Sequence, residues 1–220
     1  MAIRQALFDL NGTLFDPGAM AAPLEGDGAE ELADAILGDT VLLAMAETLS
    51  GSYRDFSELL RAAAQRRLAA SGQTDRVNAV VAAATEMRPY PEAAAAIAAL
   101  RGAGIAAGVL TNSSTDTARR LVERAGLPEL APIVGTDDVR AFKPARRVYE
   151  RGVEASGNDP SNVVLISAHS WDVLGAKRAG LRGAWVSRRE RVRMPIDPRP
   201  DFEAPDLAAA AAQITDTDAA

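Results

Sequence analysis

Residues 5–13 read QALFDLNGT, an apolar run that reaches an aspartate and then breaks into turn-forming residues. A short, uninterrupted apolar run of this kind is consistent with a strand buried on both faces of a sheet. Asn11 and Gly12 follow, and this pair is typical of a turn. The stretch therefore predicts a buried strand whose carboxyl end presents the carboxylate of Asp9.

Helical and apolar strand patterns alternate in the second half of the chain. Strand patterns occupy residues 105–110, 132–134, 163–166 and 183–186, and helical patterns occupy residues 93–100, 116–125, 144–155, 172–179 and 207–214. The strand segments are apolar throughout, which is typical of a parallel sheet covered by helices on both faces. The sequence thus predicts an α/β fold with a Rossmann-like, doubly wound parallel sheet.

The segment between these two parts has a different composition. Residues 17–30 are rich in proline and glycine, and residues 30–87 show helical periodicity without a clear strand. We therefore expect a helical cap inserted after the first strand. The predicted core comprises residues 1–16 and 88–220, and the predicted cap comprises residues 17–87.

Composition narrows the class of protein. The chain carries 30 acidic and 24 basic residues, and this acidic balance argues against binding to a nucleic acid backbone. It contains no cysteine, which excludes disulfides and thiol chemistry. The N-terminus lacks the pattern of a signal peptide, and no apolar stretch has the length of a membrane span. We expect a cytoplasmic protein without a nucleic acid or membrane partner.

Polar and charged side chains gather where the predicted strands end. Ligands of open α/β sheets bind beyond the carboxyl ends of the strands. At this edge Asp9 is a potential nucleophile that forms an ester with the substrate. A nearby Lys143 would keep the Asp9 carboxylate ionised. Asp172 would prepare the water that hydrolyses the ester. The residues at or near these strand ends are Asp9, Asn11, Thr13, Thr111, Asn112, Lys143, Ser167, His169 and Asp172.

Each of these residues also has an ordinary structural interpretation. Asp9 could belong to a turn, Asp172 could stabilise the start of a helix, and Lys143 could be a solvated loop residue. His169, the only histidine, could cap a helix, and Trp171 could simply pack. The convergence of the whole set on one sheet edge favours a reactive site over this combination of separate explanations.

Four short motifs are similar to those of the haloacid dehalogenase superfamily. They are FDLNGTLFD at residues 8–16, Thr111-Asn112, FKP at residues 142–144 with Tyr149, and SAHSWD at residues 167–172. Their order and spacing fit across residues 5–188. The resemblance implies a Rossmann-like core, a helical cap between the first two motifs, and a hydrolase that works through a covalent aspartyl intermediate.

Two positions distinguish the subfamilies. Phosphatases of this superfamily carry a second aspartate where this chain has Asn11, and usually a magnesium-binding aspartate where it has Ala168. At both positions the chain is similar to the 2-haloacid dehalogenases, which use no metal and no cofactor. The resemblance then implies displacement of halide from an (S)-2-haloalkanoate, a small organic acid, giving a 2-hydroxy acid.

The same resemblance implies roles for individual residues. Asp9 attacks the substrate, and Lys143 and Asp172 ready the water that cleaves the ester. His169 stands where many of these enzymes have an asparagine. The residues expected to orient the nucleophile or bind the substrate are Asn11, Thr13, Thr111, Asn112, Tyr149, Ser167, His169 and Trp171. Dimers are usual in this group, so the resemblance also implies a homodimer.

Two alternatives remain open at this stage. Dehalogenases supply an arginine from the first cap helix, but this chain has no lysine or arginine between Phe15 and Tyr53. One alternative is a magnesium-dependent phosphatase acting on a small phosphomonoester, with Asp9, the Asn11 carbonyl and Asp172 around the metal. The other is a non-catalytic binding module that keeps the fold.

Overall fold

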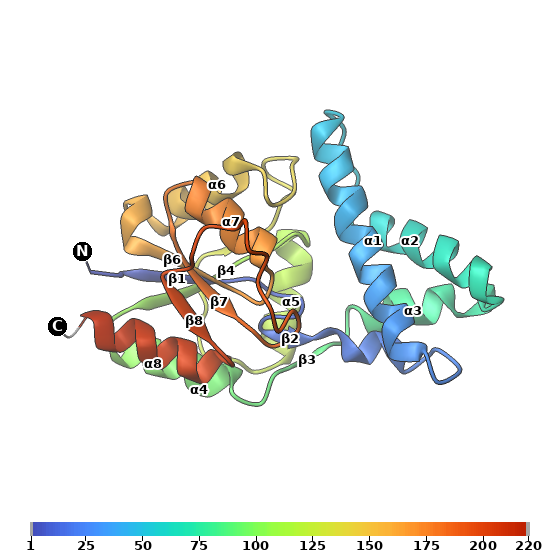
Figure 1. Cartoon of the computed structure of the whole chain (residues 1–220), viewed down its shortest axis with the longest axis horizontal. Coiled ribbons are helices and arrows are strands. Elements are labelled where there is room, and N and C mark those ends of the chain that lie inside the picture. Colours follow the sequence, from blue (N-terminus) through green and yellow to red (C-terminus); the bar gives the residue numbers. More distant parts are fainter. Residues whose placement is uncertain (1, 219–220) are drawn as a thin grey trace.

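The computed structural model describes residues 2–218 and contains a six-stranded parallel sheet (Figure 1). The strand order is β5-β4-β1-β6-β7-β8. Every pair of neighbours in this sheet runs parallel, so the predicted doubly wound α/β fold is confirmed. The strands are β1 (Gln5–Phe8), β4 (Ala106–Leu110), β5 (Ile133–Val134), β6 (Val163–Ser167), β7 (Arg182–Val186) and β8 (Phe202–Ala204).

Helices cover both faces of the sheet because alternate strand residues point in opposite directions. Phe8 of β1 packs into a cluster with α4 (Ala93–Gly102), α5 (Thr115–Arg124) and α8 (Leu207–Asp218). Its neighbour Leu7 packs into a second cluster with the other two core helices. These are α6 (Arg146–Ser156) and α7 (Ser170–Arg178), which lie across the sheet from α4 and α8 in Figure 1.

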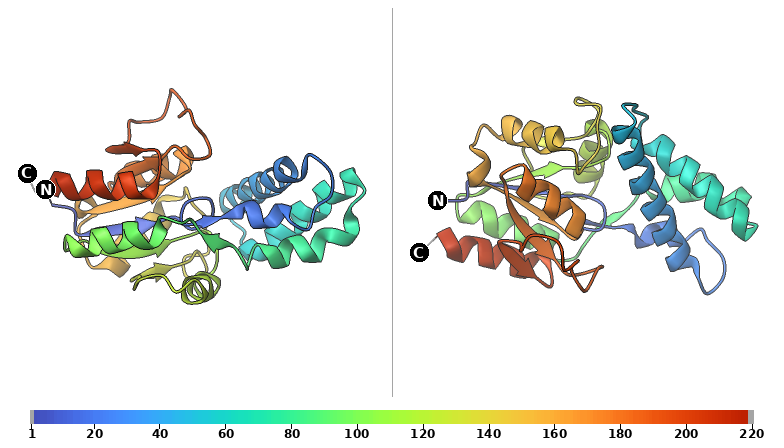
Figure 2. Two further views of the ribbon diagram at one scale, coloured as in Figure 1. Left: turned by 90° about the horizontal axis from the view of Figure 1, so that it is seen from below. Right: turned by 45° about the horizontal axis from the view of Figure 1, so that its top comes forward.

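The helical insert after β1 forms a separate layer at one end of the sheet (Figures 1 and 2). Its own hydrophobic cluster includes Ile36, Leu60 and Leu68, all buried. Two short antiparallel strands, β2 and β3, connect the insert to the sheet domain. The elements are β2 (Phe15–Asp16), η1 (Pro17–Ala21), α1 (Ala29–Leu49), α2 (Phe56–Ser71), η2 (Thr74–Arg76), α3 (Val77–Ala83) and β3 (Arg88–Pro89).

An aromatic contact joins the insert to the sheet domain. The fully buried ring of Phe142 stacks on Tyr53, with 5.0 Å between ring centroids, and contacts Phe56 at 6.1 Å. The backbone N–H of Phe142 donates to the Thr48 hydroxyl at 2.9 Å. Because Phe142 directly precedes Lys143, this contact fixes the insert against the loop that carries the only buried lysine of the described chain.

The structure differs from the sequence-based expectations in several elements. Helix α6 begins at Arg146 and not at Pro144, because the backbone of Ala145, its N-cap residue, is extended. Strands β2, β3 and β8 were not predicted, because each is only two or three residues long and includes a charged residue, unlike the equally short but apolar β5. Within residues 2–218, no helix combines the length and the apolar character needed to cross a membrane.

Candidate active site

A buried lysine bridges two carboxylates at the carboxyl edge of the sheet. The Lys143 ammonium lies 2.7 Å from Oδ1 of Asp9 and 2.7 Å from Oδ2 of Asp172. It also donates to the backbone carbonyl of Leu110 at 2.9 Å. All three charged side chains are buried, so the network is shielded from bulk water. The structure therefore brings the predicted nucleophile, lysine and second aspartate into direct contact.

Strand topology explains why these residues meet. Strand β1 lies between β4 and β6, and all three run parallel, so their carboxyl ends share one edge. Asp9 directly follows β1, and Asp172 sits in the first turn of α7 after β6. The side chain of Asn112, after β4, accepts a hydrogen bond from the backbone N–H of Lys143 at 2.8 Å. This bond anchors the lysine loop to the same edge.

Hydroxyl groups hold the remaining carboxylate oxygens. The Thr13 hydroxyl donates to Oδ2 of Asp9 at 2.8 Å and accepts from the backbone N–H of Ala168 at 2.9 Å. The Tyr149 hydroxyl donates to Oδ1 of Asp172 at 2.7 Å. Every carboxylate oxygen of the pair thus has a defined donor, which restricts the rotation of both side chains.

These contacts shift the pKa of Asp9 downwards. Burial acts to raise the pKa of Asp9, but the charge of Lys143 and then that of His169 act against it. Hydrogen bonds from Lys143 and Thr13 add to this effect, so the net pKa of Asp9 lies below the ordinary value of an aspartate. The Asp9 carboxylate is therefore ionised at neutral pH, which a carboxylate nucleophile requires.

The partner groups shift in the opposite direction. Burial raises the pKa of Asp172, and the nearby Asp9 adds to the rise against the charge of Lys143. Burial lowers the pKa of Lys143, but the two carboxylates outweigh it and the net pKa is raised. Lys143 consequently stays protonated at neutral pH. The pKa values of the two carboxylates are thus pushed apart, an arrangement that favours different chemical roles for the two groups.

A small cavity of about 300 Å³, including its opening to solvent, lies above Asp9, and we call it the nucleophile cavity. Its wall on the insert side is apolar, while the wall on the sheet side is mainly polar. It is lined by Asp9, Asn11, Leu37, Val41, Phe56, Thr111, Asn112, His169 and Trp171. Five of the eight predicted substrate-binding residues lie in this lining: Asn11, Thr111, Asn112, His169 and Trp171.

The imidazole of His169 lies beside the nucleophile. Its Nε2 atom is 3.9 Å from Oδ2 of Asp9 and 3.0 Å from the backbone carbonyl oxygen of Asn11. The ring stacks on Trp171 with 5.4 Å between centroids, and its Nδ1 atom is 3.9 Å from a carboxylate oxygen of Glu190. His169 is the only residue with a basic side chain in the lining of the nucleophile cavity.

The structure does not bring the other three predicted substrate-binding residues to this cavity. Thr13, Tyr149 and Ser167 are fully buried beneath it. Thr13 and Tyr149 bind the two carboxylates, and the Ser167 hydroxyl accepts a hydrogen bond from the backbone N–H of His169 at 3.2 Å. Their geometry suits them to positioning other residues, because none of the three reaches the space above Asp9.

Sequence reasoning missed the apolar wall of the cavity. Leu37 and Val41 are one helical turn apart on α1, and Phe56 begins α2. The helical spacing of the first two was visible, but it gave no sign of which face would meet the sheet. The first basic residues of the insert do not line the cavity either. Arg54 binds Glu47, and Arg61 binds Asn78.

The residues at this edge do not fit the magnesium site of the phosphatase alternative. A magnesium ion demands near-octahedral coordination by oxygen atoms. Within residues 2–218, no group of three or more histidine, aspartate or glutamate side chains is arranged to hold a metal ion, and Asp9 and Asp172 are both paired with the Lys143 ammonium. Position 168, where such phosphatases usually carry a third carboxylate, is an alanine.

Comparisons with known proteins agree with the motifs and the geometry. A family model described as haloacid dehalogenase-like hydrolase matches residues 3–180. (S)-2-haloacid dehalogenase 1 of Pseudomonas sp. (strain CBS-3) is 30% identical over 193 residues, covering 84% of this chain and 85% of that protein. Haloacetate dehalogenase H-2 of Moraxella sp. (strain B) is 34% identical over 120 residues, which is 54% of each chain.

Solved structures show the same relationship. The L-2-haloacid dehalogenase of Xanthobacter autotrophicus superposes with a TM-score of 0.88 at 26% identity, covering 96% of this chain and 98% of that one. A second structure of that enzyme, with chloropropionic acid covalently bound, superposes with a TM-score of 0.87. The chain therefore belongs to the haloacid dehalogenase-like hydrolases and is a hydrolase of the 2-haloacid dehalogenase type.

Proposed function

We propose that the protein hydrolyses the carbon–halogen bond of (S)-2-haloalkanoic acids in two steps. In the first step an oxygen of Asp9 attacks C2 of the substrate, the C2–halogen bond breaks, and the halide leaves with the bonding electron pair. The product of this step is an ester between Asp9 and the substrate carbon. Lys143 stays protonated throughout and binds the carboxylate oxygen that does not attack. This contact fixes the orientation of the carboxylate, which reduces the entropy cost of the attack.

In the second step a water molecule attacks the carbonyl carbon of the Asp9 ester. The bond between that carbon and the ester oxygen breaks, so the 2-hydroxy acid leaves with an oxygen that came from Asp9, and the water supplies the oxygen that restores the Asp9 carboxylate. One proton from the water must be removed, and the raised pKa of Asp172 makes this residue the better acceptor of the two carboxylates. The net reaction consumes one water and releases one halide and one proton.

The observation that carries the proposal is the buried bridge Asp9–Lys143–Asp172 below a small cavity whose wall on the insert side is apolar. The covalent chloropropionic acid in the structure of the Xanthobacter autotrophicus relative supports an ester intermediate. The leaving halide needs hydrogen-bond donors or positive charge around it. Asn112 and His169 supply such groups from the sheet side of the cavity.

The test measures halide release in EDTA from both enantiomers of three acids: 2-chloropropionate, 2-bromopropionate and 2-bromobutanoate. We expect release from the (S)-enantiomers and none from the Asp9→Asn variant. A single turnover in ¹⁸O-labelled water should place the label on Asp9 and not directly on the product. The absence of halide release from the whole panel would refute the proposal, and magnesium-dependent hydrolysis of p-nitrophenyl phosphate would restore the phosphatase alternative.

A further inference from the structure

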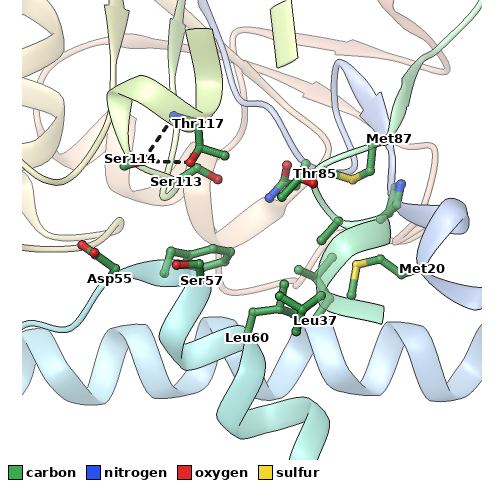
Figure 3. Close-up of a pocket in the computed structure, with 15 residues that line it drawn as sticks. Met20, Leu37, Asp55, Ser57, Leu60, Thr85, Met87, Ser113, Ser114 and Thr117 are labelled. Carbon is green, nitrogen blue, oxygen red and sulfur yellow. Dashed lines mark hydrogen bonds between the residues drawn. The ribbon is translucent and has the colours of Figure 1, made fainter. Parts of the chain in front are cut away.

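A second, larger cavity lies next to the nucleophile cavity, between the helical insert and the sheet domain (Figure 3). Its volume is about 640 Å³ including its opening to solvent, and we call it the cap–core chamber. It is lined by Asn11, Pro17, Met20, Leu37, Asp55, Phe56, Ser57, Leu60, Val81, Ala84, Thr85, Met87, Ser113, Ser114 and Thr117. The proposed reaction centre does not account for this space.

The chamber adjoins the reaction centre. Asn11, Leu37 and Phe56 line both the cap–core chamber and the nucleophile cavity. These three side chains thus form the boundary that a molecule bonded to Asp9 would cross to enter the chamber. Including their openings to solvent, the nucleophile cavity encloses about 300 Å³ and the chamber about 640 Å³, so the chamber offers the larger space for a long substrate.

The lining of the chamber identifies the chemistry of its occupant. Thioether and aliphatic side chains of Met20, Leu60 and Met87 form much of the wall on the insert side, as Figure 3 shows. Asp55 is the only charged residue in the lining, and no basic side chain belongs to it. An anionic or phosphorylated group would find no counter-ion here, whereas a hydrocarbon chain would be removed from water.

The polar wall across from these residues is largely satisfied by its own contacts. The Ser114 hydroxyl accepts from the backbone N–H of Thr117 at 3.3 Å and lies 3.0 Å from the Thr117 hydroxyl, as the N-cap of α5 (Figure 3). The side-chain oxygen of Asn11 is buried without a hydrogen-bond partner, but it lies at the boundary with the nucleophile cavity, where the polar end of the substrate would sit. Because Ser114 and Thr117 contact each other, the part of the chamber away from Asn11 suits an apolar chain better than a polar one.

We propose that the cap–core chamber binds the hydrocarbon tail of the substrate, so that the preferred substrates are 2-haloalkanoic acids with alkyl chains longer than that of a 2-halopropionate. This inference rests on the proposed function for the identity of the reacting end. The carboxylate and the halogen stay in the nucleophile cavity with Asp9. The tail passes Asn11 and lies between Leu60 and Met87.

The experiment compares kcat/KM for halide release along the series 2-bromopropionate, 2-bromobutanoate, 2-bromohexanoate and 2-bromooctanoate. Each methylene transferred from water to an apolar site is expected to raise kcat/KM about fourfold until the chamber is filled. The variants are Ser57→Trp and Thr85→Trp, which place an indole in the chamber at two exposed positions and remove no buried side chain. Leu49→Trp is the matched control, because this residue is 88% exposed and lies outside the lining.

The proposal predicts that kcat/KM rises with chain length in the native protein and in Leu49→Trp, and that the rise disappears in both chamber variants. Equal kcat/KM along the series in the native protein would overturn it. A rise that survives in both chamber variants would overturn it as well.

A binding measurement separates this inference from the proposed function. Calorimetric titration of Asp9→Asn with lactate and with 2-hydroxyoctanoate requires no turnover. If no acid releases halide but 2-hydroxyoctanoate binds more tightly than lactate, and Ser57→Trp removes the difference, the chamber assignment stands and the reaction assignment fails. If neither hydroxy acid binds, the chamber assignment fails.

Discussion

Replacement of Lys143 by methionine tests the electrostatic basis of the site. Methionine keeps most of the volume of the lysine side chain but removes the ammonium group. Asp9 and Asp172 would then face each other inside the protein without the cation that lies 2.7 Å from both. We expect a loss of activity together with a loss of stability that depends strongly on pH.

The size of the effect follows from the geometry. Removing one partner of a buried ion pair typically costs about 3–5 kcal/mol, because the remaining charge stays desolvated. A Coulomb estimate gives a similar value. The two carboxylate oxygens each lie 2.7 Å from the same nitrogen, so they are at most twice this distance, about 5.4 Å, apart, and at that distance they repel by roughly 3 kcal/mol at an effective dielectric constant of about 20. We therefore expect the free energy of unfolding at pH 7 to fall by about 3–5 kcal/mol in Lys143→Met.

The dependence on pH has a defined sign. In the native protein the pKa of Asp9 is lowered, so its contribution to stability is present above the pKa of an unfolded aspartate and is lost as the pH falls through the folded value. Without Lys143, burial and mutual repulsion raise the pKa of both carboxylates in the folded state. The folded variant then binds more protons than the unfolded chain, so its stability deficit shrinks as the pH is lowered from 7 towards 5.

The assay is urea unfolding monitored by the fluorescence of Trp171 and Trp185 at several pH values. Lys177→Met is the matched control, because Lys177 is the only other lysine and its ion pair with Asp201 is partly exposed to solvent. That change is expected to cost no more than about 1 kcal/mol. A Lys143→Met variant that loses no more stability than Lys177→Met, or whose deficit is constant from pH 7 to pH 5, would refute the electrostatic argument.

Three further substitutions probe the groups around the carboxylates. His169→Asn removes an electrostatic interaction that lowers the pKa of Asp9, so the acid limb of the pH profile of kcat/KM should move to higher pH. A limb that stays in place would contradict this. Thr13→Val leaves a buried backbone N–H without its acceptor and should lower the unfolding free energy by about 1–3 kcal/mol in urea titrations. Gly175→Ala would place a methyl group 2.3 Å from the Tyr149 hydroxyl oxygen, and overpacking should lower the thermal midpoint despite the better helix propensity of alanine.

Much of the site could be predicted because it is encoded locally at the ends of strands. In a parallel sheet the carboxyl ends of neighbouring strands share one edge, so Asp9 after β1 and Asp172 after β6 meet once the strands are recognised. Asn112 after β4 joins them for the same reason. The turn residues and apolar runs that define these strands are visible in the sequence alone.

The tertiary structure decided which residues reach the substrate space and which act beneath it. Tyr149 and Thr13 carry hydroxyl groups that a sequence pattern cannot distinguish from substrate-binding groups. Packing of α6 against α7, where Gly175 leaves room for the phenol, turns Tyr149 towards Asp172. The apolar wall of the nucleophile cavity, which includes Leu37, and the cap–core chamber both depend on how the insert packs against Phe142.

The sequence by itself thus indicated the alternation of strands and helices in the sheet domain, the helical insert and the polar side chains that gather at the strand ends, because these follow from periodicity and from the position of residues relative to strand ends. Only the tertiary structure decided the shape of the space above Asp9, because that space lies between two parts of the chain whose relative placement is set by long-range contacts. A local hydrophobic pattern shows that a helix face is buried, but it does not show which surface covers that face.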